Sequence, residues 1–143
     1  MKERYHLSKE ERAKEERIKA LTSIYEAWEK EKWKVLGIVT SSDDKERKQH
    51  CATDIVEFMK QKNVTVCFYE EDELDADKIE KASEELIVLG LRPVDRYADG
   101  LFYAKKCDAL ILVEKCGYSK YKDIEASLKI LKDNNIIVAG VVL

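Results

Sequence analysis

The stretch Lys34–Met59, KVLGIVTSSDDKERKQHCATDIVEFM, decides the fold. Its first part, Val35–Thr40, is an apolar run typical of a strand buried on both faces. A short polar turn, Ser41–Asp44, leads into a segment with the apolar spacing of an amphipathic helix. In many α/β proteins such a turn holds a phosphate at the N-terminus of the helix. Here the turn contains no glycine and carries two carboxylates, Asp43 and Asp44.

The alternation of strand and helix continues to the end of the chain. Apolar runs rich in β-branched residues predict five strands, and amphipathic segments between them predict four helices. Because helical crossovers join parallel strands and cover both faces of the sheet, we predict one three-layer α/β/α domain over residues 34–143. The predicted strands are Val35–Thr40, Val64–Tyr69, Leu86–Gly90, Ala109–Glu114 and Ile136–Leu143; the predicted helices are Asp44–Lys62, Asp75–Ser83, Arg96–Lys105 and Lys120–Asp133.

A further helix is predicted before this domain, within residues 1–33. Ser8 and Glu11 have the spacing of a capping box, so the helix should begin there. Lys9–Arg17 is charged on all sides, whereas an apolar stripe at helical spacing runs from Ile18 to Trp28. Two interpretations stay open: a helix that lies on the domain with a solvated first half, or a contact with a partner or another copy of the chain.

The composition fits one globular domain and gives no overall electrostatic reason to bind nucleic acid. The 143 residues are 45% hydrophobic, with a formal net charge of -3 and a pI of about 5.6. A near-neutral balance of this kind lacks the basic surface of nucleic-acid-binding domains. No apolar run approaches the ~20 residues of a membrane span. We therefore expect a cytoplasmic protein without direct membrane insertion.

The cysteines and histidines predict no metal site. The four cysteines lack CxxC and other metal-ligand spacing, and the chain has only two histidines. Cys67 and Cys107 fall in segments predicted to be buried, so we expect reduced core thiols. The remaining cysteines are Cys51 and Cys116.

The candidate ligand site is the edge of the sheet where the strands end, because α/β sheets bind ligands beyond the carboxyl ends of their strands. Carboxylates of the turn and of the acidic loop after the second strand could hold a divalent cation there. The simpler interpretation is a capped helix next to a solvated acidic loop. The segments expected to line the site are Ser41–Lys45, Glu70–Glu73, Leu91–Val94 and Lys115–Ser119, and the carboxylates are Asp43, Asp44, Glu70, Glu71 and Asp72.

Basic residues near the same edge allow an anion site as a second possibility. Lys45, Arg47 and Lys48 lie at the start of a predicted helix, and Arg92 and Arg96 flank Pro93. On an amphipathic helix such residues usually form a solvated face. No aromatic residues are interleaved with them to stack on bases, so nucleic acid remains an unexpected partner.

Three other patterns occur at this edge and in the segments after it. A receiver-type acidic site would need an aspartate at the end of the third strand, where Leu89 and Gly90 stand. His50 and Cys51 point apart on a helix and cannot act as a catalytic pair. Tyr118 and Tyr121 follow the fourth strand and are candidate phosphorylation targets of an active kinase.

A resemblance to a known family is carried by three segments: VLGIVTSS at Val35–Ser42, EELIVLGLRPVDRYADGLFYAKKCDALILVEKCGYSK at Glu84–Lys120, and IEASLKILKDNNIIVAGVVL at Ile124–Leu143. From Lys34 onward the chain resembles the MinD/ParA-like P-loop ATPases. It is most similar to the cytoplasmic domain of bacterial tyrosine kinases of capsular exopolysaccharide synthesis. The resemblance implies a five-stranded parallel sheet of order 2-3-1-4-5, whereas a flavodoxin-like sheet would have the order 2-1-3-4-5.

The chain departs from this family where the family binds nucleotide. In the alignment implied by the resemblance, the glycine positions of the phosphate loop fall at Lys45 and Arg47. Lys48 keeps the lysine, but the hydroxyl that binds Mg²⁺ becomes Gln49. The Walker B aspartate falls at Gly90.

Further departures follow along the chain. Phe68 and Glu70 stand in place of the aspartates of the second strand, and the family's D-T-P-P stretch is reduced to Gly90–Pro93. The insertion before the third strand is shortened to a short loop and helix, and no tyrosine-rich tail follows.

The carboxylates of the turn oppose nucleotide binding in their own right. Asp43 and Asp44 are each stabilised at a helix N-terminus by ~0.3–1 kcal/mol, and Asp43 with Glu46 can form a cap. A triphosphate would meet this negative charge and would lack the cradle of backbone N–H groups. The positions that still correspond to the phosphate loop are Ser41, Ser42 and Lys48.

The sequence therefore predicts a non-catalytic relative of the capsular tyrosine kinases, a scaffold or regulatory protein-interaction module in exopolysaccharide synthesis or export. No catalytic residue and no cofactor are expected. The expected partner is a protein, such as a membrane polysaccharide-export component that holds the chain at the inner face of the membrane, and the N-terminal helix could form a homo-oligomer. The alternatives are a nucleotide-binding protein, or a residual ATPase or tyrosine kinase, that uses Lys48 with ATP and Mg²⁺, and a small-ligand binding domain.

Overall fold

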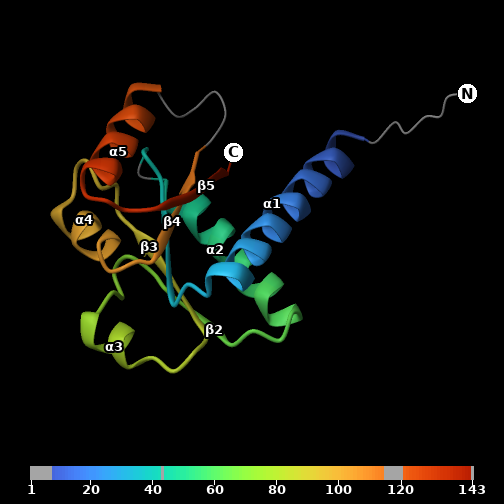
Figure 1. Cartoon of the computed structure of the whole chain (residues 1–143). Helices are drawn as coiled ribbons and strands as arrows, with labels where there is room; N and C mark the ends of the chain where they lie inside the picture. The colour runs from blue at the N-terminus through green and yellow to red at the C-terminus, as the bar shows by residue number, and fades with distance from the viewer. Residues whose placement is uncertain (1–7, 43, 115–120, 143) are drawn as a thin grey trace, which may run out of the picture.

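The computed structural model describes residues 8–42, 44–114 and 121–142 as a central parallel sheet with helices on both faces (Figure 1). The strands lie in the order β2-β3-β1-β4-β5, and every neighbouring pair is parallel, which confirms the predicted topology. Each strand and helix begins and ends within two residues of its predicted bounds. The strands are β1 Val35–Val39, β2 Val66–Tyr69, β3 Leu86–Leu91, β4 Ala109–Val113 and β5 Val138–Val142; the helices are α1 Lys9–Glu31, α2 Lys45–Gln61, α3 Ala76–Lys81, α4 Ala98–Ala104 and α5 Tyr121–Asp133.

Two apolar clusters, one on each face of the sheet, form the core. Alternate residues of β1 point to opposite faces, so Leu36 and Ile38 join the cluster under α1 and α2, whereas Val35 and Val39 join the cluster under α3, α4 and α5. The central strands β1, β3 and β4 are buried along their whole length, as their apolar runs predict.

Helix α1 is anchored to the domain by its second half. It begins at the predicted capping box, in which the N–H of Glu11 donates to Ser8 Oγ at 3.1 Å. Residues 9–19 are exposed, whereas Trp28 is only 4% exposed and its Nε1–H donates to the carbonyl oxygen of Trp33 at 3.0 Å. The structure therefore agrees with a helix that lies on the domain and has a solvated first half, and it contains nothing that tests a contact with another molecule.

Strand β5 differs from its prediction. The run Ile136–Leu143 was expected to be buried on both faces, but Ile137 is 62% exposed and Val141 is 50% exposed. The reason is position: β5 is the last strand of the sheet and pairs only with β4 in the described part of the chain. The pairing also shifts register between Leu110 and Ile111, which marks a bulge.

Several sequence-based expectations lie outside the described residues. These are the roles of Asp43 in the turn, of Tyr118 as a phosphorylation target and of Cys116, together with the loop segment Lys115–Ser119.

We predict that Trp28→Ala lowers the free energy of unfolding by about 3–5 kcal/mol, because it removes a large buried side chain and leaves a cavity. Ile18→Ala on the exposed half of the same helix should change it by no more than ~0.5 kcal/mol. Urea denaturation followed by circular dichroism measures both values. Equal effects of the two substitutions would contradict the anchoring of α1 through its second half.

Candidate functional site

The turn between β1 and α2 is closed by its own side chains. Asp44 is the N-cap of α2, and its carboxylate accepts from the N–H of Arg47 at 3.0 Å. The N–H of Asp44 donates in turn to Thr40 Oγ1 at 3.2 Å. The capping residue that the structure describes is Asp44. The expected cap by Asp43 lies outside the described residues, and its expected partner Glu46 lies 3.8 Å from His50. A carboxylate thus occupies the helix end at which a phosphate loop holds phosphate.

Ser41 is fully buried and is bound by a carboxylate from the neighbouring strand. Both its backbone N–H and its hydroxyl donate to Glu114, which directly follows β4 and is 1% exposed. The Ser41 carbonyl oxygen accepts from the guanidinium of Arg96. These bonds leave the buried Ser41 hydroxyl turned toward Glu114 and away from solvent. Ser42, next in the turn, is half-buried.

Lys48 points into the protein and not to solvent, so its expected place on a solvated face is wrong. The residue is 2% exposed. Its ammonium forms an ion pair with Glu71 and donates to the carbonyl oxygen of Leu91 at 2.6 Å. A buried ammonium needs such partners because desolvation of an unpaired charge costs several kcal/mol. The lysine that would reach phosphate in a nucleotide-binding relative is here engaged within the chain.

The acidic loop after β2 binds α2 through three successive residues. Glu70 accepts from the side-chain amide of Gln49, Glu71 pairs with Lys48, and Asp72 lies 3.9 Å from Lys45. The sequence predicted a solvated loop or a cation site. Instead, Glu71 is turned inward while its neighbours bind at the surface.

Arg92, which follows β3, lies near the ion pair of Lys48 and Glu71. Its Nε lies 4.0 Å from Glu71, and its Nη1 lies 3.6 Å from Asp99 at the start of α4. Helix α4 can approach because Gly100 has no side chain: a Cβ there would lie 2.3 Å from the Arg92 carbonyl oxygen. Arg92 and Arg96 therefore do not form the expected basic patch, because Arg92 lies near Glu71 and Asp99 whereas Arg96 donates to the carbonyl oxygen of Ser41.

Gly90, the position that the resemblance aligns with the Walker B aspartate, lies beside an aromatic ring. A Cβ at Gly90 would lie 3.4 Å from the ring of Phe68, which stands at one of the positions where the family has an aspartate. A carboxylate at position 90 would therefore emerge against an aromatic ring.

One exposed group has the arrangement of possible cation ligands. Carboxylate oxygens of Glu70, Asp72 and Glu73 lie within 4.8 Å of one another. Glu70 and Asp72 belong to the expected cation group, whereas Glu71 is turned away to Lys48 and Asp44 caps α2. Glu70 accepts a hydrogen bond from Gln49, and Asp72 lies near Lys45, so both carboxylates have partners without a metal. The cation site stays a prediction.

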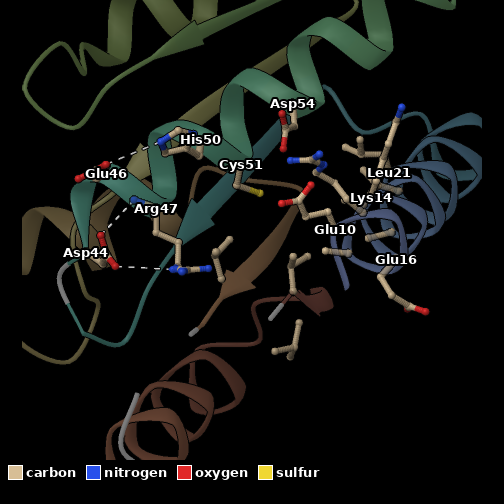
Figure 2. Close-up of a pocket in the computed structure, with 17 residues that line it drawn as sticks. Glu10, Lys14, Glu16, Leu21, Asp44, Glu46, Arg47, His50, Cys51 and Asp54 are labelled. Atoms are coloured by element: carbon tan, nitrogen blue, oxygen red, sulfur yellow. Dashed lines mark hydrogen bonds and ion pairs between the residues drawn. The ribbon is translucent and has the colours of Figure 1, made fainter. Parts of the chain in front are cut away.

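A groove of about 1080 Å³ lies on the opposite side of α2. Figure 2 shows α1 and α2 on two sides of it, with charged side chains of both signs along the walls. Its floor contains the apolar side chains of Val113, Val141 and Val142. Among the described residues, the wall residues Glu10 and Lys14 have no ion-pair partner within 4 Å.

The described cysteines Cys51, Cys67 and Cys107 are partly buried free thiols, so the burial expected of Cys67 and Cys107 is incomplete. Burial, with a smaller effect of Asp54, raises the pKa of Cys51 to about 12. Burial, with the charge of Glu84, raises the pKa of Cys67 to about 11. Burial also raises the pKa of Cys107. Because the thiolate is the nucleophile, these positions are poor candidates for catalysis.

No helix in the described ranges is long and apolar enough to cross a membrane.

The fold is comparable with that of a solved kinase domain. The kinase domain of the Escherichia coli tyrosine kinase ETK matches with a TM-score of 0.72, over 85% of this chain and 71% of that one, at 13% sequence identity. No protein-family model and no curated protein matches the chain. The match confirms the fold that the resemblance implied.

The internal roles of two carboxylates at this edge were not predicted from the sequence: Glu114 binds Ser41, and Glu71, expected only as a cation ligand, pairs with Lys48. Glu114 could have been suspected, because a charged residue that directly continues a fully apolar strand usually needs a buried partner. No comparable signal distinguishes Glu71 from Glu70 and Asp72 in an acidic run.

We predict that Lys48→Met destabilises the protein by about 3–5 kcal/mol, because it leaves the Glu71 carboxylate without its buried partner. Lys45→Met is the matched control, since Lys45 and Asp72 are exposed, and it should cost no more than ~0.5 kcal/mol. Denaturant titration measures both. A neutral Lys48→Met variant would contradict the structural importance of this pair.

We predict that Cys51, Cys67 and Cys107 are alkylated slowly by iodoacetamide at pH 8 in the native protein, because their raised pKa values keep the thiols protonated. The labelling rate should rise with pH toward those values and should become fast in denaturant. Peptide mass spectrometry assigns the label to each residue. Rapid native labelling of Cys51 would show that its surroundings are not those described.

Proposed function

We propose that this protein is a non-catalytic relative of the capsular polysaccharide tyrosine kinases, a scaffold or regulatory module that acts by binding other proteins. The observation that carries the proposal is the ion pair between Lys48 and Glu71 at the aligned phosphate-loop lysine. The same edge contains a helix capped by Asp44, a Ser41 hydroxyl bound to Glu114, and Gly90 at the aligned Walker B position. Each of these features removes one part that nucleotide chemistry needs.

The fold likeness to a tyrosine kinase domain supports the link to polysaccharide synthesis or export, together with the resemblance of the sequence. In this proposal the protein is cytoplasmic and reaches the inner face of the membrane through a membrane polysaccharide-export component. Binding assays with the cytoplasmic segments of export components encoded beside its gene test this link. Failure of every such segment to bind would leave the polysaccharide assignment without support.

The central experiment is a thermal-shift titration with ATP and ADP in the presence of Mg²⁺, with isothermal calorimetry as the second measurement. We predict no saturable rise of Tm and no binding heat, since only a ligand that binds the native state stabilises it. The ETK kinase domain is the positive control. Saturable stabilisation that is lost in Lys48→Met, with each protein compared with its own Tm, would favour the alternative of a nucleotide-binding protein or a residual ATPase or tyrosine kinase.

We also propose self-association through the exposed half of α1 as one way in which the scaffold assembles. The charges of Glu10, Lys14 and Arg17 face the groove and have no partner among the described residues. In an antiparallel pair of α1 helices, Glu10 of one copy can lie opposite Arg17 of the other, which gives complementary charges.

We predict that the full chain forms oligomers in light scattering after size exclusion, and that Lys14→Glu with Arg17→Glu shifts it toward the monomer. Lys122→Glu with Lys132→Glu on α5 is the matched control, because it makes the same change of net charge on the other face of the sheet. A monomeric wild-type chain at high concentration, or equal effects of both double variants, would contradict assembly through α1.

A further inference from the structure

The side chain of Glu71 occupies a position suited to a bound anion. The Lys48 ammonium is buried and faces it directly, and Arg92 Nε approaches the same carboxylate at 4.0 Å. The carbonyl oxygen of Leu91 takes a second hydrogen bond of the ammonium at 2.6 Å. Two cations around one carboxylate form the surroundings that an oxygen of a small oxyanion would also favour.

The loop holds Glu71 in that position from both sides. Glu70 is bound to Gln49 and Asp72 lies against Lys45, so each neighbour of Glu71 is fixed to α2. The loop is also closed on itself: the N–H of Glu70 donates to Glu73 Oε1 at 3.1 Å, and the N–H of Glu73 donates to the carbonyl oxygen of Glu70 at 2.9 Å. A carboxylate tethered in this way has a high effective concentration at Lys48, and an anion from solution must compete with it.

The space next to the ion pair leaves no room for a second anion. The cavity lined by Lys48, Glu71, Phe68 and Gly90 has a volume of about 10 Å³. Such a space holds at most about one water molecule. Entry of an anion therefore requires the Glu71 side chain to leave.

We propose that Glu71 is a built-in occupant of an anion site and that the loop 70–74 is a latch that keeps this site closed to small oxyanions. The contact is autoinhibitory in the sense that the protein's own carboxylate takes the place of a carboxylate or phosphate ligand beside Lys48 and Arg92. This inference rests on the proposed function, because it gives the reason why an inherited phosphate-loop lysine binds no nucleotide.

Removal of the carboxylate tests the proposal by chemical rescue. Glu71→Ala should lower Tm by on the order of 10 °C, because Lys48 loses its buried partner. Sodium formate should then raise the Tm of this variant in a saturable manner, whereas sodium chloride at equal ionic strength should not. Inorganic phosphate and pyrophosphate, used as separate ligands, show whether the opened site accepts more than a small carboxylate. If Glu71→Ala does not fold in buffer alone, recovery of folded protein on addition of sodium formate, followed by circular dichroism against sodium chloride at equal ionic strength, takes the place of the Tm measurement, because a ligand that binds only the native state drives folding.

Two controls make the result specific. The double variant Lys48→Met with Glu71→Leu replaces both charges by apolar groups and should show no saturable response to formate or phosphate. Glu80→Ala removes an exposed carboxylate of α3, outside the loop 70–74, and should respond as the wild type does, which means only the general effect of salt.

Saturable rescue of the Glu71 variant, absent from the wild type and from the double variant, supports the latch. Absence of rescue by any of the three anions, or an equal response of the wild type, overturns it. Failure of rescue leaves the proposed non-catalytic function intact, because that function is tested by ATP binding to the wild type. Binding of ATP to the wild type would overturn the proposed function and the latch together.

Discussion

A buried ammonium next to a partly buried carboxylate is the constraint on which the ligand edge of this protein depends. Lys48 cannot remain charged inside the protein without an anionic partner, and Glu71 supplies that partner from the loop after β2. The pair fixes the first turns of α2 against the end of β3 through Leu91. A group that in related folds would be available to a ligand has become part of the internal structure.

Other residues along this edge also make contacts within the protein. Ser41 binds Glu114, Asp44 caps α2, and the ring of Phe68 lies beside Gly90. The fold is preserved closely enough to match the ETK kinase domain at a TM-score of 0.72, although only 13% of the aligned residues are identical. The two chains therefore share a fold while most of their aligned residues differ.

Most of the fold could be predicted from the sequence, because the spacing of apolar residues indicates which faces of strands and helices are buried. The uninterrupted apolar runs of β1, β3 and β4 required a sheet covered on both faces, and the capping box at Ser8 set the start of α1. The strand order came from the resemblance. The exposure of β5 could not be read from its composition, because an apolar run looks the same at an edge and in the centre of a sheet.

The site was less predictable than the fold. The absence of glycines and of the Walker B aspartate could be seen in the sequence, but the burial of Lys48 could not, because a lysine at that helix position fits a solvated face equally well. Its choice of Glu71 over Glu70 or Asp72 depends on side-chain direction in an irregular loop. Long-range pairs of this kind, here 23 residues apart, leave no periodic trace in the sequence.

The uncharged outer strand β5 has a consequence for handling the protein. Over Val138–Val142 no charged residue or proline discourages another chain from adding to the backbone donors and acceptors that no other described strand pairs. The bulge opposite Leu110 and Ile111 is the main feature that bends this row. Concentrated solutions should therefore be prone to slow intermolecular β-pairing, and a single lysine at an outward position of this strand is the natural remedy for crystallisation and NMR samples.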